Sequence, residues 1–149
     1  MSGEPIVVGT DGSSTADRAV DKAGELAAAF GAPLHVVMTY RAALNSAALA
    51  VASGVVVDPV SLDEGASTHA DSVVRRAADR LEGIGVKVFR RVVCAADPAD
   101  ALNAVAGDVG AQMIVVGNKG MLGARRVLGS VPNRVSHHAE CCVLIVRTC

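Results

Sequence analysis

The sequence is poor in aromatic residues, which make up 2% of its 149 residues, and it contains no Trp. Phe30, Tyr40 and Phe89 are the only aromatic side chains. The stacking platforms that bind single-stranded nucleic acid are therefore missing. The core must be built from Val, Ile, Leu and Ala instead, and hydrophobic residues account for 51% of the chain. A chain of this length and composition is expected to form one globular domain over residues 1–149.

An excess of charge of one sign is also lacking, because 14 Lys and Arg stand against 15 Asp and Glu. Without a basic field, we expect no nucleic-acid partner. The longest apolar stretch, residues 42–57, is broken by polar residues and by Gly54, and it is shorter than the ~20 residues of a membrane span. The N-terminus lacks the basic and apolar regions of a signal peptide. We therefore expect a cytoplasmic protein with no membrane partner, and we interpret residues 41–60 as a surface loop or lid.

The four cysteines show no C-x-x-C spacing, which fits a reducing compartment. Cys141 and Cys142 would point to opposite faces of a strand, so a shared zinc or disulfide is not expected. His137, His138, Glu140 and Cys141 form the one metal-like group of the sequence. We interpret them as ordinary residues at the end of a helix and predict no metal site.

Apolar runs and amphipathic segments alternate along the chain. The runs predict strands at 6–9, 34–40, 86–93, 113–116 and 142–146, and the amphipathic segments predict helices at 14–30, 61–81, 98–109 and 130–139. Ser14 and Asp17 have the spacing of a capping box for the first helix. The strand at 86–93 alternates polar and apolar residues, so we place it at a sheet edge. This order predicts an α/β fold with a doubly wound, mainly parallel sheet and helices on both faces.

Ligands of such sheets bind outside the carboxyl ends of the strands, where the strand order reverses. This rule selects the loop at 10–14, the end of the second strand at Met38 and Thr39, and the glycine-rich loop at 117–129. The glycines let successive N–H groups turn toward an anion, and the Ser130 hydroxyl lies at the start of a helix. The sequence therefore predicts a polyphosphate site. Lys119 could add charge at its rim, although we favour a solvated loop residue there.

Asp11 follows a predicted buried strand, where a carboxylate costs free energy unless it is paired or bound to a ligand. Asp11 could contact the ligand or cap the turn at Gly12. Thr39 could contact the edge of an adenine or a ribose, or it could be a packing residue at the end of its strand. Gly9 occupies the place where haloacid-dehalogenase-like phosphatases have their nucleophilic aspartate. The fingerprints of dinucleotide-binding and Walker-type proteins are absent as well.

The chain resembles the universal stress protein family over nearly its whole length. The resemblance rests on Val7-Val-Gly-Thr-Asp11-Gly-Ser13, Asp97-Pro-Ala-Asp-Ala-Leu102, Ile114-Val-Val-Gly117-Asn-Lys-Gly120, Gly129-Ser-Val131 and Val143-Leu-Ile-Val146. The glycines are similar to the G-x-x-G and G-[ST] pattern of the ATP-binding branch of the family. Gly120 and Gly129 enclose one residue fewer than that pattern does.

The resemblance implies a Rossmann-like five-stranded sheet in the order 3-2-1-4-5. It also implies a nucleotide-dependent regulatory role in stress, with ATP or another adenine nucleotide as ligand, with or without Mg²⁺. Because Asp11 is the only obvious acid at the predicted site, we expect a binding protein and not an enzyme. A homodimer is implied through residues 142–146, a terminal apolar strand that no later element covers. The alternatives are a slow ATP hydrolase and a nucleotide-free dimeric scaffold. The candidate binding residues are Thr10, Asp11, Gly12, Thr39, Val116, Gly117, Lys119, Gly120, Gly129, Ser130 and Val131.

Overall fold

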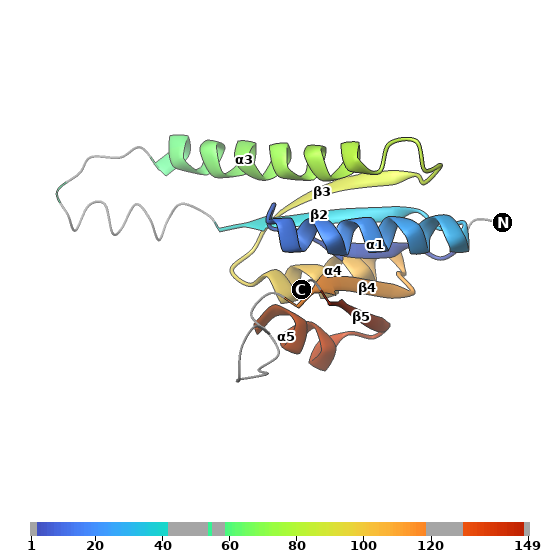
Figure 1. Cartoon of the computed structure of the whole chain (residues 1–149). Coiled ribbons are helices and arrows are strands. Elements are labelled where there is room, and N and C mark those ends of the chain that lie inside the picture. The colour runs from blue at the N-terminus through green and yellow to red at the C-terminus, as the bar shows by residue number, and fades with distance from the viewer. Residues whose placement is uncertain (1–2, 42–53, 55–58, 119–129, 148–149) are drawn as a thin grey trace.

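The computed structural model describes residues 3–41, 54, 59–118 and 130–147, in which strands and helices alternate (Figure 1). In chain order the elements are β1 (Ile6–Gly9), α1 (Ser14–Phe30), β2 (Leu34–Tyr40), α3 (Pro59–Arg80), β3 (Val88–Cys94), α4 (Pro98–Val109), β4 (Met113–Gly117), α5 (Ser130–His138) and β5 (Cys142–Val146). The predicted elements are confirmed to within two residues at each end.

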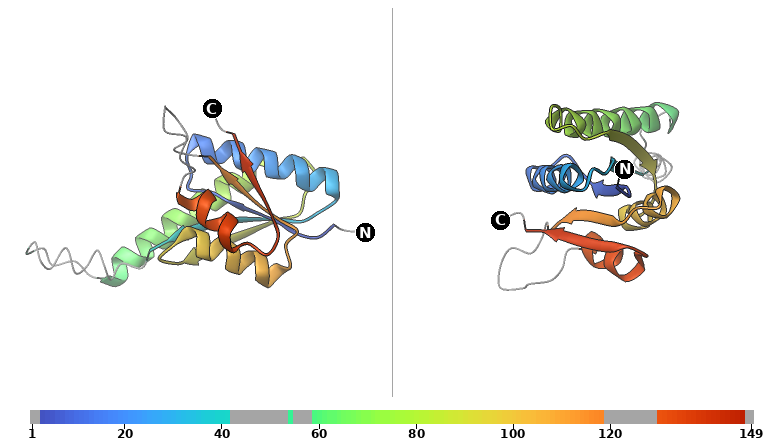
Figure 2. Two further views of the ribbon diagram at one scale, coloured as in Figure 1. Left: turned by 90° about the horizontal axis from the view of Figure 1, so that it is seen from below. Right: turned by 90° about the vertical axis from the view of Figure 1, so that its right-hand side faces the viewer.

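The five strands form one sheet in the order β3-β2-β1-β4-β5, and all neighbouring strands are parallel. The predicted fold and strand order are confirmed. Helices α1 and α3 cover one face of the sheet, and α4 and α5 cover the other (Figure 2). The chain runs outward from β1 to β3 and then crosses to β4 on the other side of β1. The strand order therefore reverses between β1 and β4.

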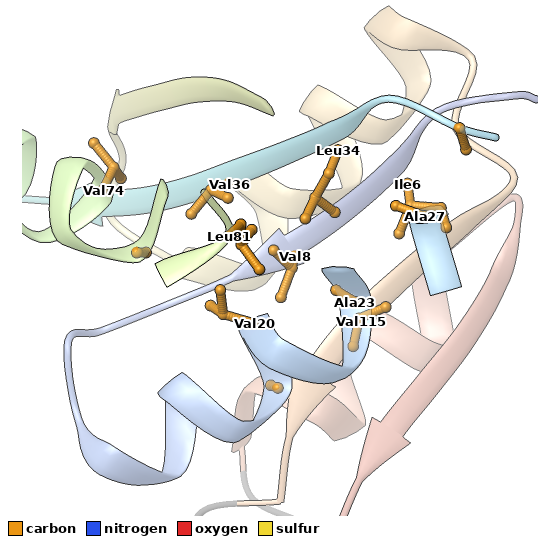
Figure 3. Close-up of a cluster of buried hydrophobic side chains, with 13 residues drawn as sticks. Ile6, Val8, Val20, Ala23, Ala27, Leu34, Val36, Val74, Leu81 and Val115 are labelled. Atoms are coloured by element: carbon orange, nitrogen blue, oxygen red, sulfur yellow. The ribbon is translucent and has the colours of Figure 1, made fainter. Parts of the chain in front are cut away.

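The core lies on both faces of the central strands. Ile6 and Val8 point toward α1 and α3, whereas Val7 points toward α4 and α5, and all three are fully buried. This explains why β1 is a continuous apolar run rather than an alternating one. Figure 3 shows the cluster on the α1 and α3 face, to which the helices contribute Val20, Ala23, Ala27 and Val74 and the turn after α3 contributes Leu81.

Helices α1 and α3 approach each other closely at Gly24. A Cβ atom on Gly24 would lie 2.5 Å from Leu81 Cδ2, so a larger residue would force the Leu81 side chain to move. Arg80 of α3 reaches across the same contact, and its Nη2 lies 2.6 Å from Asp21 Oδ2. A small residue and an ion pair thus fix the spacing of the two helices.

The start of α1 differs from the sequence prediction, because Ser13 and not Ser14 caps the helix. Ser13 has an extended backbone, and its Oγ accepts a hydrogen bond from the Ala16 N–H at 3.2 Å. Gly12 has a φ of +79°, which turns the chain so that Ser13 reaches this position. Asp17 does not complete a capping box with Ser14; its carboxylate lies 3.6 Å from Arg80 Nη1.

β3 lies at a sheet edge, as predicted, and exposes Arg90 and Arg91, and Lys87 is exposed directly before the strand. Charged side chains on an edge strand oppose pairing with other chains. His35 of β2 is buried beside them, 5% exposed, and its ring stacks on Phe89 with centroids 4.7 Å apart. Burial, together with the Arg91 cation, holds the pKa of His35 below its ordinary value.

The expected loop or lid at 41–60 falls largely outside the described residues, although α3 already begins at Pro59. None of the helices that the structure describes is long and apolar enough to cross a membrane. Among the described residues, no three His, Cys, Asp or Glu side chains are grouped to hold a metal ion.

Candidate functional site

A cavity of about 290 Å³ opens at the carboxyl ends of β1, β2 and β4. It lies at the point where the strand order reverses, as the sequence analysis predicts for this fold. The first turns of α1, α4 and α5 surround it, and each contributes lining residues. The predicted residues that line it are Thr10, Asp11, Thr39, Val116, Gly117 and Val131.

The loop after β1 is held by its own short hydrogen bonds. The Thr10 N–H donates to the Val37 carbonyl at 2.9 Å, and Thr10 Oγ1 accepts from the Gly12 N–H at 3.1 Å. Asp11 Oδ1 accepts from the Ser13 N–H at 3.0 Å. Gly12 does not line the cavity but supplies the turn, and Arg76 of α3 donates to its carbonyl at 2.9 Å. This loop presents Thr10 and Asp11 to the cavity in a fixed position.

Asp11 is exposed, so the prediction of a buried carboxylate there is wrong. The chain leaves the sheet at Thr10, and the turn carries the next residue to the surface. The argument that Asp11 needs a ligand to offset its burial therefore fails. Its place on the rim of the cavity remains.

β2 and β4 provide the floor of the cavity. Val37 is fully buried, and Met38 and the half-buried Thr39 continue β2 along the lining. On the other side of β1, Val116 is 3% exposed and Gly117 ends β4. Lys119, Gly120 and Gly129 fall outside the described residues. Ser130 opens α5, and its backbone therefore lies next to Val131 on the rim.

The lining residues that the sequence did not predict include four apolar ones at helix starts, namely Ala16 of α1, Pro98 and Leu102 of α4, and Pro132 of α5. The sequence predicts Pro98 only as the first residue of a helix. Because helices of a parallel sheet start at the carboxyl edge, the helix starts were the signal that could have found these residues. Their apolar side chains give the cavity a mainly apolar wall.

The three helix N-termini at the cavity differ in charge. α1 carries Asp17 in its first turn, and α4 has Asp97 as its cap and Asp100 in its first turn. α5 has no acidic residue in its first turn. A helix N-terminus attracts anions through its free N–H groups and its dipole. An anionic group of a ligand would therefore be placed best at the start of α5, with the apolar part of the ligand in the cavity.

Comparisons with known proteins agree with this architecture. A family model described as the universal stress protein family matches residues 3–147. A universal stress protein of Mycobacterium tuberculosis is 36% identical over 144 residues, which cover 96% of this chain and 95% of that protein. A universal stress protein solved in complex with cAMP is 34% identical, with a TM-score of 0.73 over the full length of both chains.

A second solved structure, a universal stress protein from Archaeoglobus fulgidus in complex with dAMP, is 24% identical. It has a TM-score of 0.69 and covers 97% of this chain and 98% of that chain. At this identity the likeness concerns the fold. The family match and the Mycobacterium tuberculosis relative both extend over nearly the whole chain. This chain therefore belongs to the universal stress protein family.

Proposed function

We propose that this chain is a regulatory protein of the stress response that binds ATP or another adenine nucleotide. The observation that carries the proposal is the apolar cavity at the switch point of the sheet, with a helix N-terminus free of acidic residues at its rim. Flat bases bind in apolar pockets with a few polar groups, and phosphates bind at helix N-termini. The relative that is 34% identical was solved with cAMP, an adenine nucleotide.

In this proposal the adenine lies among Val37, Met38 and Leu102, and Thr39 and Asp11 face the base and the ribose. The phosphates lie beside Gly117 and the start of α5 at Ser130 and Val131. Lys119, Gly120 and Gly129 belong to the same proposed phosphate site. A metal such as Mg²⁺ would accompany a triphosphate and would meet Asp11 as the nearest carboxylate of the described lining.

Binding is a better-supported role for the site than hydrolysis. Asp11 is the one ionisable side chain among the described lining residues. A hydrolase needs a base to activate water and commonly a second group to hold a metal or to stabilise the leaving phosphate. We therefore propose that the nucleotide acts as a bound signal.

Isothermal titration of the whole protein with cAMP, AMP and ATP tests the proposal. We expect a saturable heat with one ligand per chain for at least one of the three nucleotides, and no such heat with GTP. The nucleotide with the lowest Kd shows which arrangement of phosphates the site prefers. Absence of saturable binding for all three nucleotides at millimolar concentration would contradict the proposal.

We also propose a homodimer that pairs along β5. The Cys142 N–H donates to the Gln112 carbonyl and the Asn118 N–H donates to the Val146 carbonyl, so the even-numbered residues of β5 direct their backbone toward β4. The backbone groups of Val143 and Ile145 therefore face the outer edge. A second copy of this chain could pair with them and cover the edge.

The side chains of residues 143–146 in β5 all pack against one of the two core clusters. Leu144 and Val146 pack against the α1 and α3 cluster, and Val143 and Ile145 pack against the α4 and α5 cluster. All four are half-buried. Within the part of the chain that the structure describes, β5 thus presents backbone groups at its outer edge, and a test of dimerisation must act on the backbone.

A further inference from the structure

The carboxylate of Asp97 connects the starts of two helices. Its Oδ1 accepts a hydrogen bond from the Ala99 N–H at 2.8 Å and so caps α4. Its Oδ2 lies 2.6 Å from Arg134 Nη1 of α5. Arg134 Nη2 also lies 3.8 Å from Asp100 Oδ1. One carboxylate therefore fixes the N-terminus of α4 and holds α5 against it.

The two helices form adjoining walls of the cavity. Pro98 and Leu102 of α4 line it on one side, and Val131 and Pro132 of α5 line it on the other. Pro98 follows Asp97 directly, and Pro132 lies two residues before Arg134. The ion pair between Asp97 and Arg134 thus joins the two walls close to the rim.

α5 packs on the sheet and on α4 through the apolar residues Val131, Pro132 and Val135. Val135 is fully buried, and Pro132 is buried as well, but Asn133, Ser136, His137 and His138 are exposed. The loop that would lead into α5 lies outside the described residues. An ion pair is directional, whereas apolar contacts by themselves allow a helix to rotate or slide. Arg134 therefore has a larger part in the orientation of α5 than its exposure suggests.

We infer that the ion pair of Asp97 and Arg134 is a positioning device that holds the start of α5 where it can receive the phosphate of a bound nucleotide. This inference rests on the proposed nucleotide site and deepens it. The Asp97 side chain is 22% exposed and the Arg134 side chain 52%, and pairs at such exposure add little to folding stability. The pair instead raises the fraction of molecules in which the start of α5 lies beside the cavity and can bind a phosphate.

The size of the effect follows from that fraction. When only a fraction of the molecules has a competent site, the apparent Kd rises by the inverse of that fraction. A pair of this exposure can change the fraction of molecules with a correctly placed α5 by at most about fivefold, so its loss would raise the Kd for a phosphorylated ligand about two- to fivefold. Adenosine has no phosphate, so its Kd should change much less.

Two single variants and their combination separate this role from capping. Asp97→Ser keeps a residue that caps helices well but is too short to reach Arg134. Arg134→Gln removes the cation and leaves the cap intact. Arg75→Gln is the matched control, because Arg75 Nη2 lies 2.9 Å from Asp71 Oδ2 in an exposed pair on α3 that is remote from the lining.

Titration with cAMP and with adenosine gives the deciding readout. We expect each single variant to weaken cAMP binding about two- to fivefold, the double variant to add little more, and Arg134→Lys to restore part of the affinity. Arg75→Gln should bind as the unaltered protein does. Unchanged cAMP affinity in both single variants, or equal losses for cAMP and adenosine, would overturn the inference.

Hydrogen exchange of the ligand-free variants provides a second readout that does not depend on nucleotide binding. We expect the amides of α5, including the Ala139 N–H that donates to the Val135 carbonyl at 2.9 Å, to exchange faster in both variants than in the unaltered protein. If the unaltered protein bound no nucleotide, the proposed function would fail on its own. Unchanged α5 exchange would show that the pair does not seat the helix.

Discussion

Replacement of Ala16 with Phe is expected to weaken adenine-nucleotide binding at least about 100-fold, equivalent to about 2.7 kcal/mol of binding free energy. Ala16 is half-buried in the first turn of α1 and lines the cavity. A phenyl ring projecting from this position would occupy much of the roughly 290 Å³ in which we place the base. The Ala16 N–H bond to Ser13 involves only backbone at residue 16, so the helix cap should survive.

A matched substitution on the same helix controls for the effect of Phe on α1 itself. Ala28 is exposed near the end of α1, and Ala28→Phe adds the same ring outside the cavity. Isothermal titration with cAMP and thermal unfolding should be measured for both variants. We expect lost binding with a retained unfolding transition for Ala16→Phe only. Normal affinity in a folded Ala16→Phe variant would place the nucleotide elsewhere.

Ile145→Pro is expected to convert a β5-paired dimer into a folded monomer at micromolar protein. The N–H of residue 145 faces the outer edge, so its loss removes a donor to the second copy and leaves the β4 and β5 ladder complete. Both copies lose this donor, at about 1 kcal/mol for each hydrogen bond, and the proline rings obstruct the approach of the strands. Sedimentation velocity over a range of concentrations measures the change.

Neighbouring substitutions supply the controls for this experiment. Ile145→Val keeps the N–H and should remain dimeric, which separates the backbone effect from the loss of side-chain packing. Leu144→Pro removes an N–H that faces β4 and should destabilise the sheet itself. A dimer that persists in folded Ile145→Pro would show that the copies meet through another surface.

The fold was predictable from the sequence because its strands and helices differ in periodicity. β1 and β4 are continuous apolar runs, which a parallel strand buried on both faces requires, and the amphipathic period of α3 is clear around Ala70, Val74 and Leu81. The ends of elements were less well determined. Ser13 and Ser14 have the same capping chemistry, and only the turn at Gly12 selects Ser13.

The site was predictable as a place but not as a complete set of side chains. Thr10, Thr39 and Gly117 follow from the rule that ligands bind at carboxyl ends of strands. Leu102 and Ala16 line the cavity because of how their helices are rotated on the sheet, which no local pattern encodes. The ion pair of Asp97 with Arg134 joins residues far apart in the chain, so no local pattern of the sequence predicts it.

The location of the nucleotide is tested most directly by two-dimensional NMR of the nitrogen-15-labelled whole protein during titration with cAMP. We predict that the amide signals of Thr10, Thr39, Gly117 and Val131 shift together and saturate, because these residues surround one cavity. Signals from the amino ends of the strands, such as that of Leu34 at the start of β2, should not shift. Unchanged spectra at millimolar cAMP, or shifts concentrated away from the carboxyl ends of β1, β2 and β4, would contradict the account.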